Sequence, residues 1–196
     1  LLSGQKGIGK STLAYRLINY VLSLDEEYKY DVDNQTINEE NRSFKLTLNK
    51  SNPNFILIDV VKEKKSINIS QIRTLISNLN MSSFNTKPRF ILIDNIEFLN
   101  INSVNALLKI LEEPMTNTFF ILIHNNKKIL STLSSRCLDF KISISNQNSL
   151  DIIKNLLGDN LSKYVNENLV NYYFTPGNLF NLIEFIKENN LDLSQI

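Results

Sequence analysis

Residues near the N-terminus have the types and the spacing of a phosphate-binding loop. Gly4, Gly9, Lys10 and Ser11 fit the pattern G-x-x-x-x-G-K-[ST]. In such a loop the glycines let backbone N–H groups turn toward phosphate oxygens, and the following helix adds its positive N-terminal end. The lysine would reach the β- and γ-phosphates, and the serine hydroxyl would coordinate Mg²⁺. We therefore predict a site for ATP and Mg²⁺ that is formed by Gly4, Gln5, Lys6, Gly7, Ile8, Gly9, Lys10, Ser11 and Thr12.

The surroundings of this segment agree with a loop between a strand and a helix. Three of the 5 glycines in the chain fall within it. Leu1 and Leu2 have the character of a strand end, and the apolar residues between Leu13 and Leu22 recur at helical spacing. A glycine-rich turn without a ligand is the alternative, and the strand, loop and helix order makes it the weaker interpretation.

A second candidate for the site follows an apolar run at residues 89–93. The run has the length of a buried strand and is followed by Asp94. In P-loop enzymes an aspartate in this position holds the Mg²⁺ shell, so we assign Asp94 and Ser11 to the metal. A helix-capping aspartate is the alternative. The run at residues 119–123 is followed by His124 and Asn125, and the histidine is expected to be a hydrogen-bonded strand-end residue.

The elements that would position these residues alternate between strand and helix. This order predicts an α/β fold with a mainly parallel sheet covered on both sides by helices. Predicted strands lie at residues 55–58, 89–93, 119–123 and 138–144, and predicted helices at residues 11–22, 70–79, 104–111 and 129–133. Ser70 is predicted to cap the second of these helices, and Ser149 to cap a helix further along the chain. Residues 146–196 lack strands, so we expect a core domain at 1–145 and a small helical domain at 146–196, with helices starting near 149, 161 and 178.

Composition limits the class of protein. Charges nearly cancel, with 21 Lys+Arg against 20 Asp+Glu, so no global positive charge points to nucleic acid. The single cysteine, Cys137, excludes an internal disulfide and a cysteine-rich zinc site. No apolar run approaches the length of a membrane span, and we expect a cytoplasmic protein. Because the chain begins only three residues before its loop, we expect the natural protein to extend further at its N-terminus.

Taken together, the motifs resemble the bacterial DNA polymerase III clamp-loader family. Besides the phosphate loop and Asp94, the chain contains NALLKILEEP at residues 105–114 and SRC at residues 135–137, in the order and at the spacing of that family. The resemblance is strongest from residue 67 to 141. Residues 52–98 are most similar to the delta-prime subunit and next to the gamma/tau subunit.

This resemblance implies a fold and a function. The fold would be an AAA+ module whose helical part is a lid, with the family's collar domain beyond Ile196. The function would be loading the ring-shaped sliding clamp onto primed DNA within a hetero-oligomer of loader subunits, with no membrane involved. Arg136 would be an arginine finger that reaches the ATP of a neighbouring subunit. A surface salt-bridge residue is the alternative for Arg136.

Three departures from the family pattern bear on hydrolysis. The glutamate that orients the attacking water is replaced by Asn95, a degenerate base position, because an amide cannot accept a proton from water. His124 or Asn125 stands at the sensor position, of which we assign Asn125 to the nucleotide, and no arginine follows Gly177 in the lid. The zinc cysteines are absent. We therefore favour a delta-prime-like subunit that binds ATP and whose own ATPase activity is weak or absent; a gamma/tau-like motor is the alternative, and a small-molecule P-loop kinase is a third.

Overall fold

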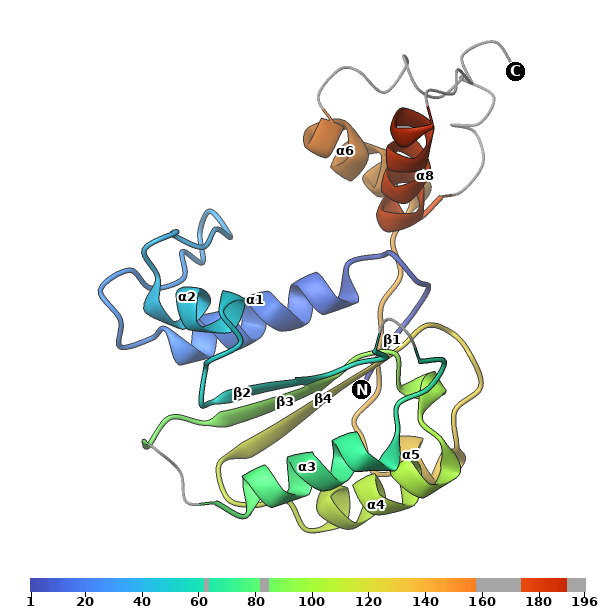
Figure 1. Cartoon of the computed structure of the whole chain (residues 1–196). Coiled ribbons are helices and arrows are strands. Elements are labelled where there is room, and N and C mark those ends of the chain that lie inside the picture. The colour runs from blue at the N-terminus through green and yellow to red at the C-terminus, as the bar shows by residue number, and fades with distance from the viewer. Residues whose placement is uncertain (62–63, 82–84, 158–173, 190–196) are drawn as a thin grey trace. The chain divides into compact units, whose positions relative to one another are not determined.

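The computed structural model describes residues 1–61, 64–81, 85–157 and 174–189 (Figure 1). The chain divides into two compact units, one made of Leu1–Leu2 and Ser11–Phe140, the other of Ser3–Lys10 and Lys141–Ile196. Residues 4–10 of the phosphate loop thus group with the C-terminal helices, whereas Ser11 and Thr12 belong to the larger unit. Our domain boundary after residue 145 remains a prediction, because a compact unit is defined by contacts and a domain by independent folding.

Within the described residues, a five-stranded sheet with the order β2-β3-β4-β1-β5 forms the centre of the fold. Strand β2 pairs in parallel with β3, and β3 pairs in parallel with β4. The carboxyl ends of these three strands therefore lie at one edge of the sheet, where the polar residues that follow them come together. The strands are β1 (Leu2–Ser3), β2 (Phe55–Ile58), β3 (Arg89–Ile93), β4 (Thr118–His124) and β5 (Phe140–Lys141).

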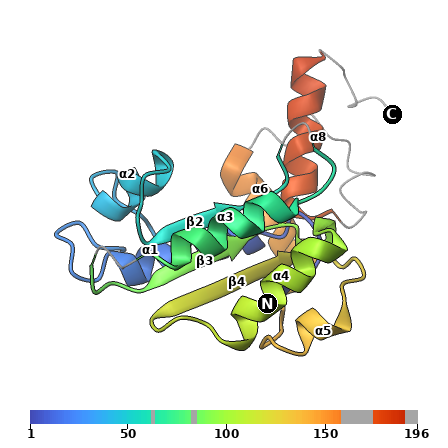
Figure 2. The same ribbon diagram turned by 60° about the horizontal axis from the view of Figure 1, so that its bottom comes forward.

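Helices cover both faces of the sheet in the larger unit. Helices α1 and α2 lie on one side, and α3, α4 and α5 lie on the other (Figures 1 and 2). Side chains alternate accordingly, since Phe90 and Leu92 pack against α1, whereas Ile91 and Ile93 belong to the core under α3 and α4. The predicted α/β fold class is confirmed. The helices are α1 (Lys10–Leu22), α2 (Arg42–Leu48), α3 (Ile69–Leu79), the 3₁₀ turn η1 (Ile96–Phe98), α4 (Ile101–Glu112) and α5 (Ser131–Ser134).

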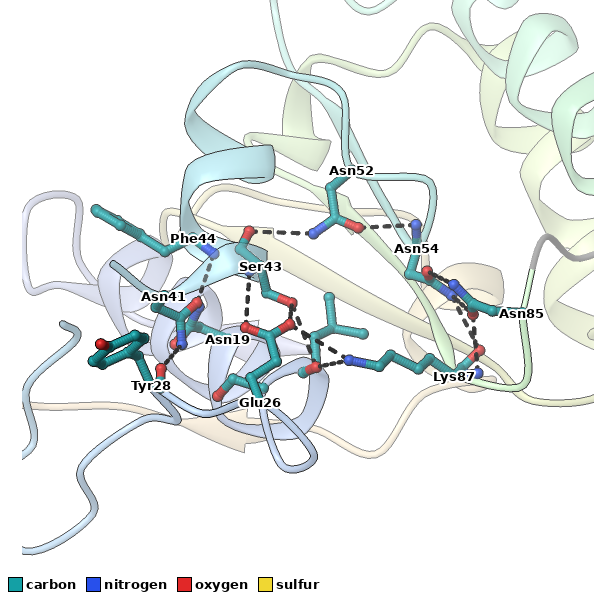
Figure 3. Close-up of polar contacts among 12 residues, drawn as sticks. Asn19, Glu26, Tyr28, Asn41, Ser43, Phe44, Asn52, Asn54, Asn85 and Lys87 are labelled. Atoms are coloured by element: carbon teal, nitrogen blue, oxygen red, sulfur yellow. Dashed lines mark hydrogen bonds and ion pairs between the residues drawn. The ribbon is translucent and has the colours of Figure 1, made fainter. Parts of the chain in front are cut away.

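Polar side chains attach the segment after α1 to the body of the unit (Figure 3). Asn41 caps α2 by accepting from the Phe44 N–H at 2.7 Å. The Glu26 carboxylate accepts from the Ser43 hydroxyl at 2.5 Å and the Ser43 N–H at 3.0 Å, and lies 3.4 Å from the Lys87 ammonium. Burial alone would raise the pKa of Glu26, but the Ser43 hydrogen bonds and the Lys87 charge outweigh it and hold that pKa below its ordinary value.

The smaller unit contains α6 (Asn146–Leu157) and α8 (Pro176–Glu188), which share a core of Ile153, Leu179 and Ile183. The predicted start of the last helix at residue 178 is wrong, because Thr175 caps α8 and Pro176 occupies its first turn. The helix predicted at 161–174 lies outside the described residues, apart from residue 174.

Three further boundaries differ from the sequence prediction. The last strand covers only Phe140–Lys141 rather than residues 138–144. Asn68, and not Ser70, caps α3, since the Asn68 N–H donates to the Gln71 side chain at 3.0 Å. Helix α6 begins at residue 146, and Ser149 is a buried helical residue rather than a cap. In the described part of the chain, no helix has both the length and the apolar character needed to cross a membrane.

Candidate nucleotide-binding site

The phosphate loop has the backbone conformation that its glycines permit. Gly4, Gly7 and Gly9 have φ values of 153°, 85° and 92°, which side-chain-bearing residues rarely adopt. A Cβ on Gly4 would lie 2.4 Å from the Ile142 carbonyl oxygen, whereas a Cβ on Gly9 would meet no atom within 4 Å. The loop therefore packs closely against Ile142 at Gly4, whereas the space beside Gly9 is open.

Lys10 begins α1 and is almost fully buried. Its ammonium donates to the Gly4 carbonyl at 3.0 Å and to the Gln5 carbonyl at 2.6 Å. Both acceptors belong to the loop itself, so the lysine charge is held against the curve of the backbone. A negative phosphate group is the ligand that such a buried charge would stabilise most.

Helix α8, in the C-terminal part of the smaller unit, contacts the same loop. The Gly177 N–H donates to the Gly7 carbonyl at 2.8 Å, and the Thr175 hydroxyl donates to the Lys6 carbonyl at 2.8 Å. A Cβ on Gly177 would lie 2.8 Å from the Gly7 Cα. The sequence reasoning missed Thr175 and Gly177 as site residues, although a threonine followed by proline is a recognisable helix start.

Ser11 and Asp94 meet at the carboxyl edge of the sheet. The Ser11 hydroxyl donates to Asp94 Oδ2 at 2.5 Å, and the Asp94 N–H donates to the Ile58 carbonyl at 2.9 Å. Tyr15 lies one turn after Ser11 on α1. Burial raises the pKa of the Tyr15 phenol, and the negative charges of Asp94 and Asp59 raise it further. The carboxylates of Asp94 and Asp59 therefore both influence the face of α1 that carries Tyr15.

Asn95 and Asn125 also come together. The Asn125 amide donates to Asn95 Oδ1 at 2.8 Å and to Glu97 Oε1 at 3.0 Å. The Asn95 amide in turn donates to Asp59 Oδ1 at 2.8 Å. Asp59 and Glu97 were not among the predicted site residues, although Asp59 follows β2 just as Asp94 follows β3, and that likeness is visible in the sequence.

The remaining loop residues contribute backbone or packing. Gln5 and Lys6 are exposed side chains whose carbonyls accept from Lys10 and Thr175. Ile8 is buried, and its Cδ1 lies 2.6 Å from the position of a Cβ on Gly4. Thr12 lies on an exposed face of α1.

The Nδ1 of His124, at the end of β4, is buried and has no hydrogen-bond partner.

Arg136 follows α5, on the side of the sheet opposite α1. Leu133 of α5 belongs to the core under α3 and α4, whereas α1 packs in the other core. The guanidinium donates to Glu112 through Nε at 2.8 Å and through a second nitrogen, and to the Thr132 carbonyl at 2.7 Å. Its side chain is 34% exposed. The neighbouring Cys137 packs against the core under α3 and α4, and burial raises the pKa of its thiol.

The residues present fit a nucleotide with Mg²⁺. Positive-φ glycines and a buried lysine provide a cradle for phosphate oxygens. A hydroxyl and a carboxylate oxygen 2.5 Å apart, from Ser11 and Asp94, provide the hard oxygen ligands that Mg²⁺ prefers. When bound, the metal would supply charge for the phosphate groups, and this chain's own residues would orient them.

The sheet order, the helices on both faces and the loop before α1 define a P-loop AAA+ module. The crystal structure of a DNA polymerase III gamma-subunit-related protein from Thermotoga maritima has this fold, with a TM-score of 0.55 at 17% identity over 94% of this chain and 52% of that chain. Residues 1–146 match the family described as "DNA polymerase III, delta subunit". The chain belongs to this family of DNA polymerase III clamp-loader subunits.

Two relatives are similar over most of this chain. The DNA polymerase III subunit gamma of Buchnera aphidicola subsp. Schizaphis graminum is 34% identical over 161 residues, which are 80% of this chain and 41% of that protein. The subunit delta' of the same organism is 30% identical over 158 residues, 79% of this chain and 46% of that protein. The chain thus spans less than half the length of either curated relative.

Proposed function

We propose that this chain is a delta-prime-like clamp-loader subunit, working in the cytoplasm. It binds ATP with Mg²⁺ in its own loop and supplies Arg136 to the nucleotide of a neighbouring subunit. The assembly of loader subunits then loads a sliding clamp onto primed DNA.

The position of Arg136 is the observation that carries this proposal. The arginine is partly exposed and oriented by Glu112 and a backbone carbonyl, and it lies across the sheet from Ser11 of its own chain. An arginine held in this way can serve a phosphate group only on another molecule. A planar guanidinium stabilises the charge of a transferring phosphoryl group through paired hydrogen bonds.

The test is the clamp-dependent ATPase activity of a loader assembled with the variant Arg136→Ala. We expect a loss of about tenfold or more, since an arginine finger contributes far more than a surface ion pair. Arg73→Ala is the matched control, because Arg73 is an exposed arginine on α3. Assembly of the variant loader is checked by gel filtration. Unchanged ATPase activity in an assembled loader would refute the finger assignment.

A gamma/tau-like motor that hydrolyses ATP itself is the second candidate. The close pairing of Ser11 with Asp94 favours it, because a metal site of this kind serves hydrolysis as well as binding. Lys10→Ala in this subunit alone separates the two candidates. Loss of all loader turnover supports the motor, and turnover that survives supports the delta-prime-like subunit. The family membership argues against a small-molecule kinase.

A further inference from the structure

A chain of hydrogen bonds links the residues that follow β2, β3 and β4. It runs from Glu97 through Asn125 and Asn95 to Asp59, with distances of 3.0, 2.8 and 2.8 Å. Both end members are carboxylates, which only accept hydrogen bonds when ionised. The orientation of both amides is therefore determined: Asn95 presents its nitrogen to Asp59 and its oxygen to Asn125.

The backbone of Asn95 holds this orientation. Asn95 has φ 56° and ψ 44°, a left-handed conformation that asparagine tolerates better than most residues. Its N–H donates to Asp94 Oδ1 at 2.8 Å. Asn95 thus hydrogen-bonds Asp94 through its backbone N–H and Asp59 through its side-chain amide.

Register and side-chain alternation place Asp59 beside Asp94. Ile58 of β2 is paired with Ile93 of β3, and both belong to the core under α3 and α4. Because successive side chains of a strand point to opposite faces, the next residues, Asp59 and Asp94, turn toward α1. The effect of both carboxylates on Tyr15 of α1 agrees with this placement. Asp59 is partly exposed, so its second oxygen can meet a ligand.

We propose that Asp59 supplies the carboxylate that position 95 lacks, and that Asn95 is a positioning residue for it. Asp59 would accept a proton from the water that attacks the γ-phosphate of ATP. The water oxygen forms a bond to the γ-phosphorus while the bond from that phosphorus to the bridging oxygen breaks. The electron pair of the broken bond stays on the bridging oxygen, which leaves as part of ADP. The proton then passes from Asp59 to the solvent. This inference rests on the proposed nucleotide binding and extends it to hydrolysis.

The test removes the carboxylate at position 59 and then supplies one at position 95. Asp59→Asn should lower single-turnover ATP hydrolysis about a hundredfold, the size of a general-base contribution, without changing the ATP dissociation constant more than about twofold. Asp59→Asn combined with Asn95→Glu returns a carboxylate to the neighbouring strand end and should recover most of the rate. Hydrolysis is measured in an assembled loader whose other subunits carry inactivated loops. Asp33→Asn is the control, because Asp33 is an exposed aspartate.

A binding measurement gives a second readout. Asp59→Asn should weaken binding of ADP with aluminium fluoride, which resembles the transferring phosphoryl group, and leave binding of ADP alone unchanged. A wild-type rate in Asp59→Asn, or failure of the double variant to recover activity, overturns the inference. A native site that binds ATP without hydrolysing it also overturns the inference but leaves the proposed function standing. A native chain that does not bind ATP overturns the proposed function itself.

Discussion

The close approach of the α8 backbone to the phosphate loop predicts the effect of Gly177→Ala. A Cβ at this position would lie 2.8 Å from the Gly7 Cα and 3.1 Å from the Gly7 carbonyl oxygen. These are backbone atoms, so the loop or the start of α8 must move. Overpacking of this kind costs about 1–3 kcal/mol, whereas alanine in a helix gains up to about 1 kcal/mol over glycine. We expect a net destabilisation of about 1–2 kcal/mol.

Two measurements on the whole chain check this expectation. Thermal unfolding should shift down by roughly 2–8 °C for a chain of this size. If the strain is taken up by the loop, affinity for ATP should fall by roughly 5- to 30-fold. Asn178→Ala is the matched control, because Asn178 is exposed and occupies the next position of α8. A Gly177→Ala variant with wild-type unfolding temperature and wild-type ATP affinity would refute the reasoning.

Two other variants test single contacts. Glu26 has a pKa below its ordinary value of 4.5, so its charged form stabilises the fold above that pH, and the contribution disappears as the pH falls through the lowered pKa. Glu26→Gln should therefore unfold at a lower temperature than wild type at pH 7, with a difference that shrinks below about pH 4; a constant difference would contradict the assignment. Glu112→Gln removes the charged acceptor of Arg136, and should reduce loader ATPase activity less than Arg136→Ala does while leaving ATP binding by this chain unchanged.

The sequence was sufficient for the parts of the site that are contiguous or follow one element. The spacing of Gly4, Gly9 and Lys10 predicts a loop, and the structure has positive φ values at its glycines. The apolar run before Asp94 predicts a strand, and β3 ends one residue before it. Such features are local, since backbone conformation and strand periodicity depend on a few neighbouring residues.

Helix starts were predicted less well. The sequence placed the start of α8 at residue 178 and the cap of α3 at Ser70, yet Thr175 and Asn68 are the caps. Several neighbouring residues of each segment can cap a helix, and the choice depends on which backbone groups the tertiary packing leaves to be satisfied.

The sequence by itself determined the fold class, the phosphate loop and the clamp-loader family, because motifs and periodicity are written in consecutive residues. Only the tertiary structure decided which distant groups meet. Asp59 reaches Asn95 because β2 and β3 pair in one register, and Glu112 holds Arg136 because α4 lies beside α5. Thr175 meets Lys6 although 169 positions separate them. Contacts of this kind arise from strand register and helix packing, which depend on the whole buried core rather than on any local pattern.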